Sequence, residues 1–112
     1  VKEEYKMSKY CVVEITYDKK DEVDKTKNEL LAKRLVASCH VLETENSYYV
    51  KGERKNKKEY LFDVITMTTK VDEIRDVVKS IHGSEFFEFA SYPITSIKES
   101  YLDWIDKKID NE

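Results

Sequence analysis

The stretch VASCHVLETENSYYVKG, residues 36–52, decides the fold. Its second half is rich in aromatic and β-branched residues, culminating in Ser47–Val50, which is typical of a β-strand. Fifteen or so extended residues at about 3.3 Å each give a strand about 50 Å long, whereas a domain of about 100 residues has a radius of gyration near 13 Å. The strand must therefore project from the globule, or a bulge must fold it back as two short strands.

A second extended run pairs with this strand. From Glu59 to Thr68 the residues alternate between two faces, so the two runs predict a β-hairpin, with Glu53–Lys58 as a polar turn after Gly52. A projecting hairpin would expose aromatic side chains and unpaired edge groups, which other copies of the chain would cover. We therefore expect a closed homo-oligomer whose interface includes four aromatic residues of the hairpin: Tyr48, Tyr49, Tyr60 and Phe62.

The remaining elements are predicted from periodicity on either side of the hairpin. The spacing predicts a strand over 10–17, a helix that begins within 18–21 and extends to residue 35, a second helix from 69 to 83, an aromatic strand over 86–94 and a C-terminal helix through residue 109. The second helix begins with a capping-box pattern, Thr69 with Asp72.

The order of elements is βαββαβα, and it predicts the ferredoxin-like α+β class. Right-handed connections and a central hairpin give a four-stranded antiparallel sheet that helices cover on one side. We expect one domain over residues 10–112, preceded by an N-terminal extension over residues 1–9 that is disordered or partly vector-derived.

Composition limits the classes of function. The chain has 112 residues, a net charge of -3 and only two glycines and one proline. Acidic and basic residues are interspersed, so no basic face favours nucleic acid. No apolar run approaches the roughly 20 residues of a membrane span, and the two cysteines are expected to be free thiols in a cytoplasmic protein.

Several motifs resemble the CutA family of divalent-cation tolerance proteins, over nearly the whole chain. The matching segments are LVASCHV (35–41), the approach to the turn (48–52), Glu59, His82 with Glu85 and Glu88, SYPI (91–94) and YLDWI (101–105). The resemblance implies a PII-like homotrimer with a ferredoxin-like subunit, linked to tolerance of copper and other divalent metals.

The chain departs from the family pattern at several positions. The family usually has HPYEVPE where residues 82–88 read HGSEFFE, so the chain loses both prolines and the tyrosine, with Gly83, Phe87 and Ser84 at those positions. Val50 replaces a tryptophan, and Ile65 replaces a lysine. These substitutions remove groups that a ligand site could use.

Cys39 and His40 adjoin each other but do not form a ligand pair, because neighbouring strand residues point to opposite faces. Cys39 shares its face with Ala37 and Val41, so it is either a small core residue or a thiolate ligand for a soft metal such as Cu(I). Cys11 is expected in the core, with no disulfide to Cys39, because the first two strands of such a sheet are not neighbours.

The resemblance adds three further residues to a possible metal site that includes Cys39: Glu59, His82 and Glu85. His82 alternatively contacts the carbonyl groups at the end of the second helix, and the two glutamates alternatively lie on the solvated surface. The sequence does not show that the four side chains meet.

Tyr101 and Trp104 are interpreted as packing anchors in preference to a ligand-stacking surface. No phosphate loop, paired-histidine helix or nucleophile elbow is present in the sequence, so we expect a protein that is not an enzyme. The leading hypothesis is a trimeric protein that weakly binds copper or another divalent cation. The alternative is a PII-like signalling or scaffolding trimer that binds a metabolite or an unidentified protein between subunits.

Overall fold

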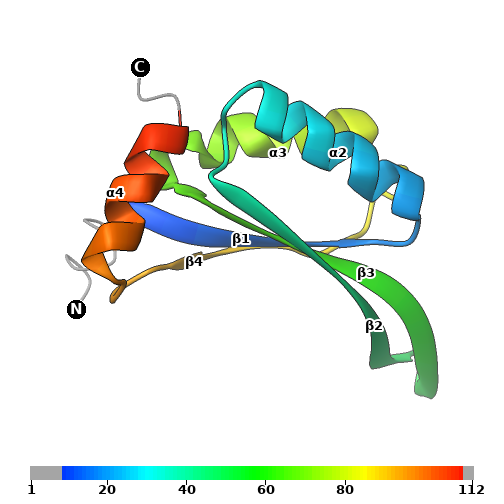
Figure 1. The fold of residues 1–112 in the computed structure, drawn as a ribbon. Helices are drawn as coiled ribbons and strands as arrows, with labels where there is room; N and C mark the ends of the chain where they lie inside the picture. Colours follow the sequence, from blue (N-terminus) through cyan, green and yellow to red (C-terminus); the bar gives the residue numbers. More distant parts are fainter. Residues whose placement is uncertain (1–8, 110–112) are drawn as a thin grey trace.

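The computed structural model describes residues 9–109 and shows a four-stranded sheet with three α-helices (Figure 1). Residues 1–8 of the predicted N-terminal extension, and the last three residues of the domain, lie outside the described part. The elements in chain order are β1 (Tyr10–Tyr17), α2 (Lys20–Ala32), β2 (Ser38–Val50), β3 (Glu53–Met67), the 3₁₀ turn η1 (Thr68–Lys70), α3 (Val71–Ile81), β4 (Phe89–Pro93) and α4 (Glu99–Lys108).

The strand order is β2-β3-β1-β4, and each neighbouring pair is antiparallel. Helices α2 and α3 lie side by side over one face of the sheet, and α4 lies at the end where β1 begins (Figure 1). This arrangement confirms the predicted ferredoxin-like α+β class.

The core lies between the sheet and helices α2 and α3. Strand β1 supplies every second side chain to it, as its alternation predicts, because successive strand residues point to opposite faces. The helices and β3 supply the rest. The buried apolar residues of this core are Cys11, Val13, Ile15, Tyr17, Val23, Leu30, Leu35, Val36, Phe62, Val64, Ile74, Val77 and Val78. A smaller cluster beneath α4 contains Ala37, Met67, Ile105 and Ile109.

The long hairpin is one uninterrupted ladder, from Ser38 opposite Ile65 to Val50 opposite Glu53. The bulge that would have folded it back is therefore absent. Strand β1 pairs with β3 only from Tyr60 onward, so the outer half of the hairpin, residues 44–59, extends beyond the body as a two-stranded ribbon (Figure 1). We call residues 44–59 the ribbon.

The turn of the hairpin is shorter than predicted. Lys51 and Gly52 alone make it, with φ angles of 50° and 82°, as a tight turn with two left-handed residues requires. The charged segment 53–58, predicted as a turn, is the first part of β3. Its charges are compatible with a strand because both faces of the ribbon are exposed.

Other boundaries also differ from the predictions. Helix α2 ends at Ala32, and Leu35 enters the core from the following loop. The capping box at Thr69 does not form, since α3 begins at Val71 after a 3₁₀ turn and has no side-chain cap. Helix α3 ends at Ile81 because His82 is extended. Strand β4 begins at Phe89, and Phe86 is 98% exposed.

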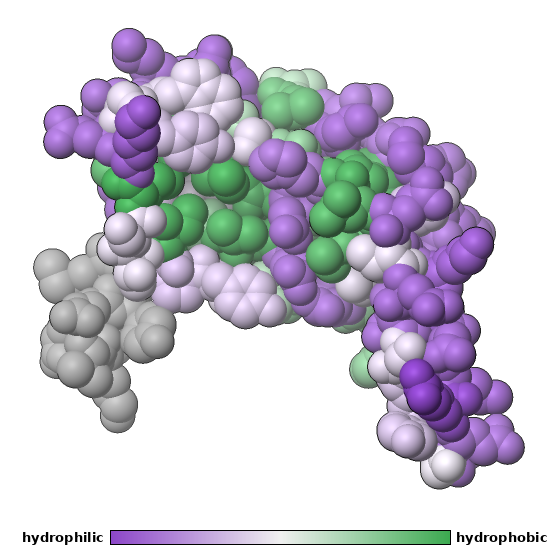
Figure 2. Space-filling model, turned by 60° about the horizontal axis from the view of Figure 1, so that its bottom comes forward, coloured by the Kyte–Doolittle hydropathy of each residue, from purple (hydrophilic) through white to green (hydrophobic). Residues whose placement is uncertain are grey.

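Helix α4 covers one end of the sheet face opposite α2 and α3, where it packs on Tyr10, Ile65 and Met67. The rest of this face has no covering element within residues 9–109. Figure 2 shows hydrophobic patches on this face, separated by a hydrophilic strip. The outward positions of the strands include apolar Val12, Leu42, Leu61 and Ile65. We call this surface the open face.

Candidate functional site

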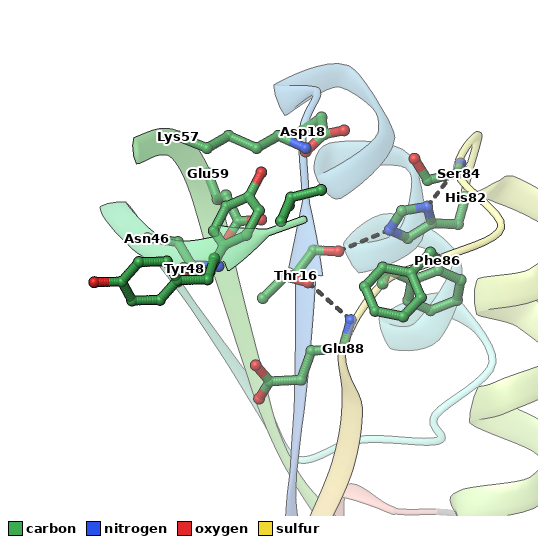
Figure 3. Close-up of a pocket in the computed structure, with 13 residues that line it drawn as sticks. Thr16, Asp18, Asn46, Tyr48, Lys57, Glu59, His82, Ser84, Phe86 and Glu88 are labelled. Carbon is green, nitrogen blue, oxygen red and sulfur yellow. Dashed lines mark hydrogen bonds and ion pairs between the residues drawn. The ribbon is translucent and has the colours of Figure 1, made fainter. Parts of the chain in front are cut away.

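A groove lies between the ribbon and the loop that connects α3 to β4 (Figure 3). Its volume is about 750 Å³. The ribbon supplies one wall through residues that include Tyr48, Tyr49 and Glu59, and residues 82–88 supply the other. We call these two structures the groove and the groove loop.

Thr16, at the end of β1, holds both ends of the groove loop. Its carbonyl oxygen accepts a hydrogen bond from His82 Nε2 at 2.7 Å. Its hydroxyl accepts from the Glu88 amide at 3.0 Å, and its own amide donates to the Glu88 carbonyl at 3.2 Å. Because both ends of the loop are hydrogen-bonded to Thr16, the path of the loop along the groove is fixed (Figure 3).

His82 is enclosed between two rings. It stacks on Tyr17 with ring centroids 4.4 Å apart and on Phe87 with centroids 3.8 Å apart. A carbonyl oxygen can only accept, so Nε2 must carry the hydrogen that Thr16 receives. Nδ1 is then the acceptor for the Ser84 amide at 3.1 Å. Both ring nitrogens are used within the subunit, and neither is available to a metal in this arrangement.

The substitution of glycine at position 83 has a local explanation. The Gly83 amide donates a hydrogen bond to Glu22 Oε1 at 3.1 Å, and a Cβ atom at this position would lie 2.7 Å from Glu22 Oε2. A proline has no N–H to donate. Of the other departures, Ser84 supplies the amide that binds His82, and Val50 lines the groove.

Aromatic and charged side chains surround the mouth of the groove. Phe86 is almost fully exposed, and Tyr49 is 75% exposed. On the ribbon side, Lys57 makes a 2.8 Å ion pair with Asp18, while Glu59 lies beside this pair on the groove wall (Figure 3).

A row of titratable residues crosses the open face. Glu14 of β1 lies opposite Asp63 of β3, and Asp63 lies opposite His40 of β2. On the other side, Glu14 lies opposite Ala90 of β4, which places Glu88 diagonally across from Glu14 on the same face. A hydrogen bond with Glu88, together with burial and the like charge, raises the pKa of Glu14 to about 7.

The four residues predicted as metal ligands do not converge within one subunit. Glu59 and His82 line the groove, Glu85 lies with His82 along a second depression beside α3, and Cys39 packs against the main core from the start of β2. Among residues 9–109, no group of three or more histidine, cysteine, aspartate and glutamate side chains is placed to hold a metal ion.

The two thiols lie on strands separated by β3. Cys11 is buried in the core, as predicted, and Cys39 is half-buried; both are free. Burial raises the pKa of Cys39 to about 11, although Lys27 acts in the opposite direction. The thiol is therefore the dominant form of Cys39 at neutral pH.

The four aromatic residues predicted for an oligomer interface have different environments. Tyr48 and Tyr49 are exposed on the ribbon, and Tyr60 packs partly against the main core. Phe62 has no exposed surface, because its position on β3 faces the helices. The prediction for Phe62 is wrong, and it is a core residue of the subunit.

Tyr101 and Trp104 form a stacked pair on α4, with ring centroids 5.3 Å apart. Tyr101 packs against the smaller cluster beneath α4, whereas Trp104 is 37% exposed with Lys108 over its ring. The packing role predicted for Tyr101 agrees with these contacts.

Sequence reasoning missed Thr16 and Phe87. Thr16 lies on the outward face of a regular strand, where a threonine is common and carries no signal of its own. The sequence predicts Phe87 within a strand, since the run Phe86–Ile94 is mostly apolar and aromatic. Only the antiparallel pairing of β1 with β4 brings Thr16 beside Glu88.

Comparison with known proteins places these features in context. Residues 11–108 match the family model described as CutA1 divalent ion tolerance protein. A protein from Danio rerio described as protein CutA homolog is 31% identical over 81 residues, which cover 71% of this chain and 54% of the fish protein. None of the helices within residues 9–109 is long and apolar enough to cross a membrane.

Two solved structures are similar in fold. One is described as the periplasmic divalent cation tolerance protein CutA from Archaeoglobus fulgidus; it has a TM-score of 0.82 and 26% identity, over 90% of this chain and 99% of that chain. The other is CutA1 from Oryza sativa, with a TM-score of 0.84 and 21% identity, over 93% of this chain and 96% of that chain.

Proposed function

Because this chain belongs to the CutA1 divalent ion tolerance family, we propose that it binds divalent cations, copper among them, as a cytoplasmic homotrimer. The family description names ion tolerance and no reaction, and we assign no catalytic role. The observation that supports cation binding most directly is the groove, where Glu59 and His82 line the same space.

A second copy would complete the ligand set. Divalent cations and copper take oxygen, imidazole and thiolate ligands in sets of four or more. One groove offers Glu59, with Glu85 on the other side of the groove loop. His82 would have to release the Ser84 amide before Nδ1 could bind a metal, and Cys39 would have to lose its proton. We propose that assembly brings these four residues of different copies closer together.

The ribbon and the open face support the trimer. A lone subunit would leave Tyr49 and the apolar positions of the open face in contact with water, and large exposed apolar surfaces are typical of association sites. We expect sedimentation equilibrium in the presence of EDTA to give a mass three times that of the 13.3 kDa subunit, since the contacts proposed need no metal. A mass equal to that of the subunit would refute the trimer.

Copper binding should depend on the proposed ligands. Glu59→Gln and Cys39→Ala are each expected to weaken Cu(II) or Cu(I) binding, measured by calorimetry, by about tenfold or more, because loss of one ligand costs at least 1.4 kcal/mol. Glu45→Gln is a matched control, since Glu45 lies opposite Lys58 in the ribbon, one residue away from the Thr44–Glu59 pair and on the other face.

Two results would count against this proposal. A wild-type protein that takes up neither ion would exclude copper as its ligand. If both variants gave the same isotherms as the wild type, Glu59 and Cys39 would not be ligands, regardless of how tightly the protein binds copper.

The groove also favours a second candidate function. A volume of about 750 Å³ lies within the usual range of small-molecule sites, about 300–1,000 Å³. We propose as the alternative a PII-like signalling or scaffolding trimer, in which the groove takes a small metabolite or a segment of a partner protein. A small molecule found by native mass spectrometry of untagged protein, in the absence of bound metal, would favour this candidate.

A further inference from the structure

Three carboxyl groups meet on the open face, and their positions follow from the register. Glu14 and Asp63 are directly opposite, where side chains lie about 4.5–5.5 Å apart at Cβ. Glu88 is diagonal to Glu14 and within its reach. Three negative charges at these distances repel one another, so the fully ionised row is unfavourable.

Few groups near the row can offset this repulsion. His40 faces Asp63 from β2 and favours its ionised form, but burial and Glu14 outweigh this and raise the pKa of Asp63. Tyr92 of β4 faces the same row, and the charges of Glu14 and Glu88 raise its pKa. Asp63 Oδ1 is buried, with no hydrogen-bond partner among the residues that the structure describes. Retention of a proton by one of the carboxyl groups is therefore the simplest way to reduce the repulsion within the row.

The repulsion acts on a weakly held part of the sheet. Strand β4 has five residues, and within residues 9–109 it pairs only with β1, at the edge of the sheet. Glu88 immediately precedes it, and the two Thr16–Glu88 hydrogen bonds attach the end of the groove loop. A force that separates Glu14 from Glu88 thus acts next to those two bonds.

We propose that a proton shared between the Glu14 and Glu88 carboxyl groups is a latch that closes the groove loop onto β1. With the proton present, one carboxyl donates to the other and the Thr16–Glu88 bonds are kept. When the proton leaves to solvent, two carboxylates face each other and the loop end separates from β1 more often. The latch acts on the groove wall whichever ligand the groove takes.

The direction of the pH dependence follows from the raised pKa of Glu14. Its pKa rises from an ordinary 4.5 to about 7 in the folded chain, so the folded state holds a proton that the unfolded state has lost. The contribution of this proton to the stability of the folded state is complete below pH 4.5. It declines as the pH rises and is lost above pH 7. The loop is therefore closed at pH 6 and opens more often at pH 8.

Hydrogen exchange measured by NMR tests the latch on the full chain. In the wild type, the protection factor of the Glu88 amide, corrected for the intrinsic pH dependence of exchange, should fall about tenfold between pH 6 and pH 8, since one pKa unit corresponds to a tenfold change in the protonation equilibrium. In Glu14→Gln, the side-chain amide still donates to Glu88 and does not titrate. The protection factor of this variant should therefore change less than about twofold between pH 6 and pH 8. Glu73→Gln, on the exposed side of α3, is the control and should behave as the wild type.

A carboxyl titration of the wild type completes the test. The Glu14–Glu88 pair should show a step near pH 7 in the carboxyl carbon shifts. If both carboxyl groups titrate in the ordinary range, the shared proton does not exist. If the step is present but Glu88 protection is the same at pH 6 and pH 8, the proton is not a latch. Either result overturns the proposal, and neither depends on metal binding.

Discussion

Phe62→Ala is expected to lower the free energy of unfolding by about 3–5 kcal/mol, the usual cost of deleting a buried phenylalanine ring. Phe62 is fully buried and lies edge-on to Tyr17, with ring centroids 6.1 Å apart. The cavity would open between β3 and the helices, where surrounding side chains are themselves packed by other elements and cannot collapse into it. Chemical denaturation followed by circular dichroism measures the change.

Tyr49→Ala is the matched control for Phe62. Tyr49 lies in the same hairpin and is also aromatic, but it is 75% exposed on the ribbon. Its replacement should change subunit unfolding by less than about 0.5 kcal/mol, as is usual for surface positions. If Phe62→Ala were as mild as Tyr49→Ala while the sedimentation mass fell, Phe62 would belong to an interface, as the sequence had suggested, and its placement in the core would be wrong.

His82→Ala is expected to lower the free energy of unfolding by about 2–6 kcal/mol. The ring loses two stacking contacts, with Tyr17 and Phe87, which are each worth about 0.5–1.5 kcal/mol beyond buried area. It also loses the bonds to Thr16 and Ser84, at about 0.5–1.5 kcal/mol each. Thermal and urea unfolding measure the total.

His82→Phe separates the two contributions. A phenyl ring keeps the stacking and loses both hydrogen bonds. His82→Phe should therefore lose about half as much free energy of unfolding as His82→Ala. The metal hypothesis makes a different prediction, since both variants would abolish a ligand but neither would need to destabilise the apoprotein. Metal-free His82→Ala as stable as the wild type would show that His82 does not hold the groove loop.

The fold could be predicted from periodicity because the sheet has one buried face. Strand β1 shows this most clearly, since Cys11, Val13, Ile15 and Tyr17 are all buried and the residues between them are not. The same reasoning failed for residues 53–58, because the ribbon has no buried face and its charged sequence resembles a turn. The turn itself depends on two left-handed residues, of which only Gly52 gives a sequence signal.

The candidate site could be predicted only in part. The sequence identified His82 and Glu59 as noteworthy, and the structure places both on the groove. It could not show that Thr16 uses the His82 ring as a hydrogen-bond donor, because the two residues are 66 positions apart. The row formed by Glu14, Asp63 and Glu88 was likewise hidden, since each comes from a different segment and only the register of three strands aligns them.

The position of β4 has a consequence for synthesis on the ribosome. Strand β1 lies inside the finished sheet, yet Cys11 pairs with Pro93 on one side and with Thr66 on the other. The hairpin can pair with β1 once residue 67 has emerged, but the second edge of β1 stays bare until the last quarter of the chain appears. A nascent or truncated chain thus carries an unpaired strand edge, the feature most apt to recruit other chains into aggregates.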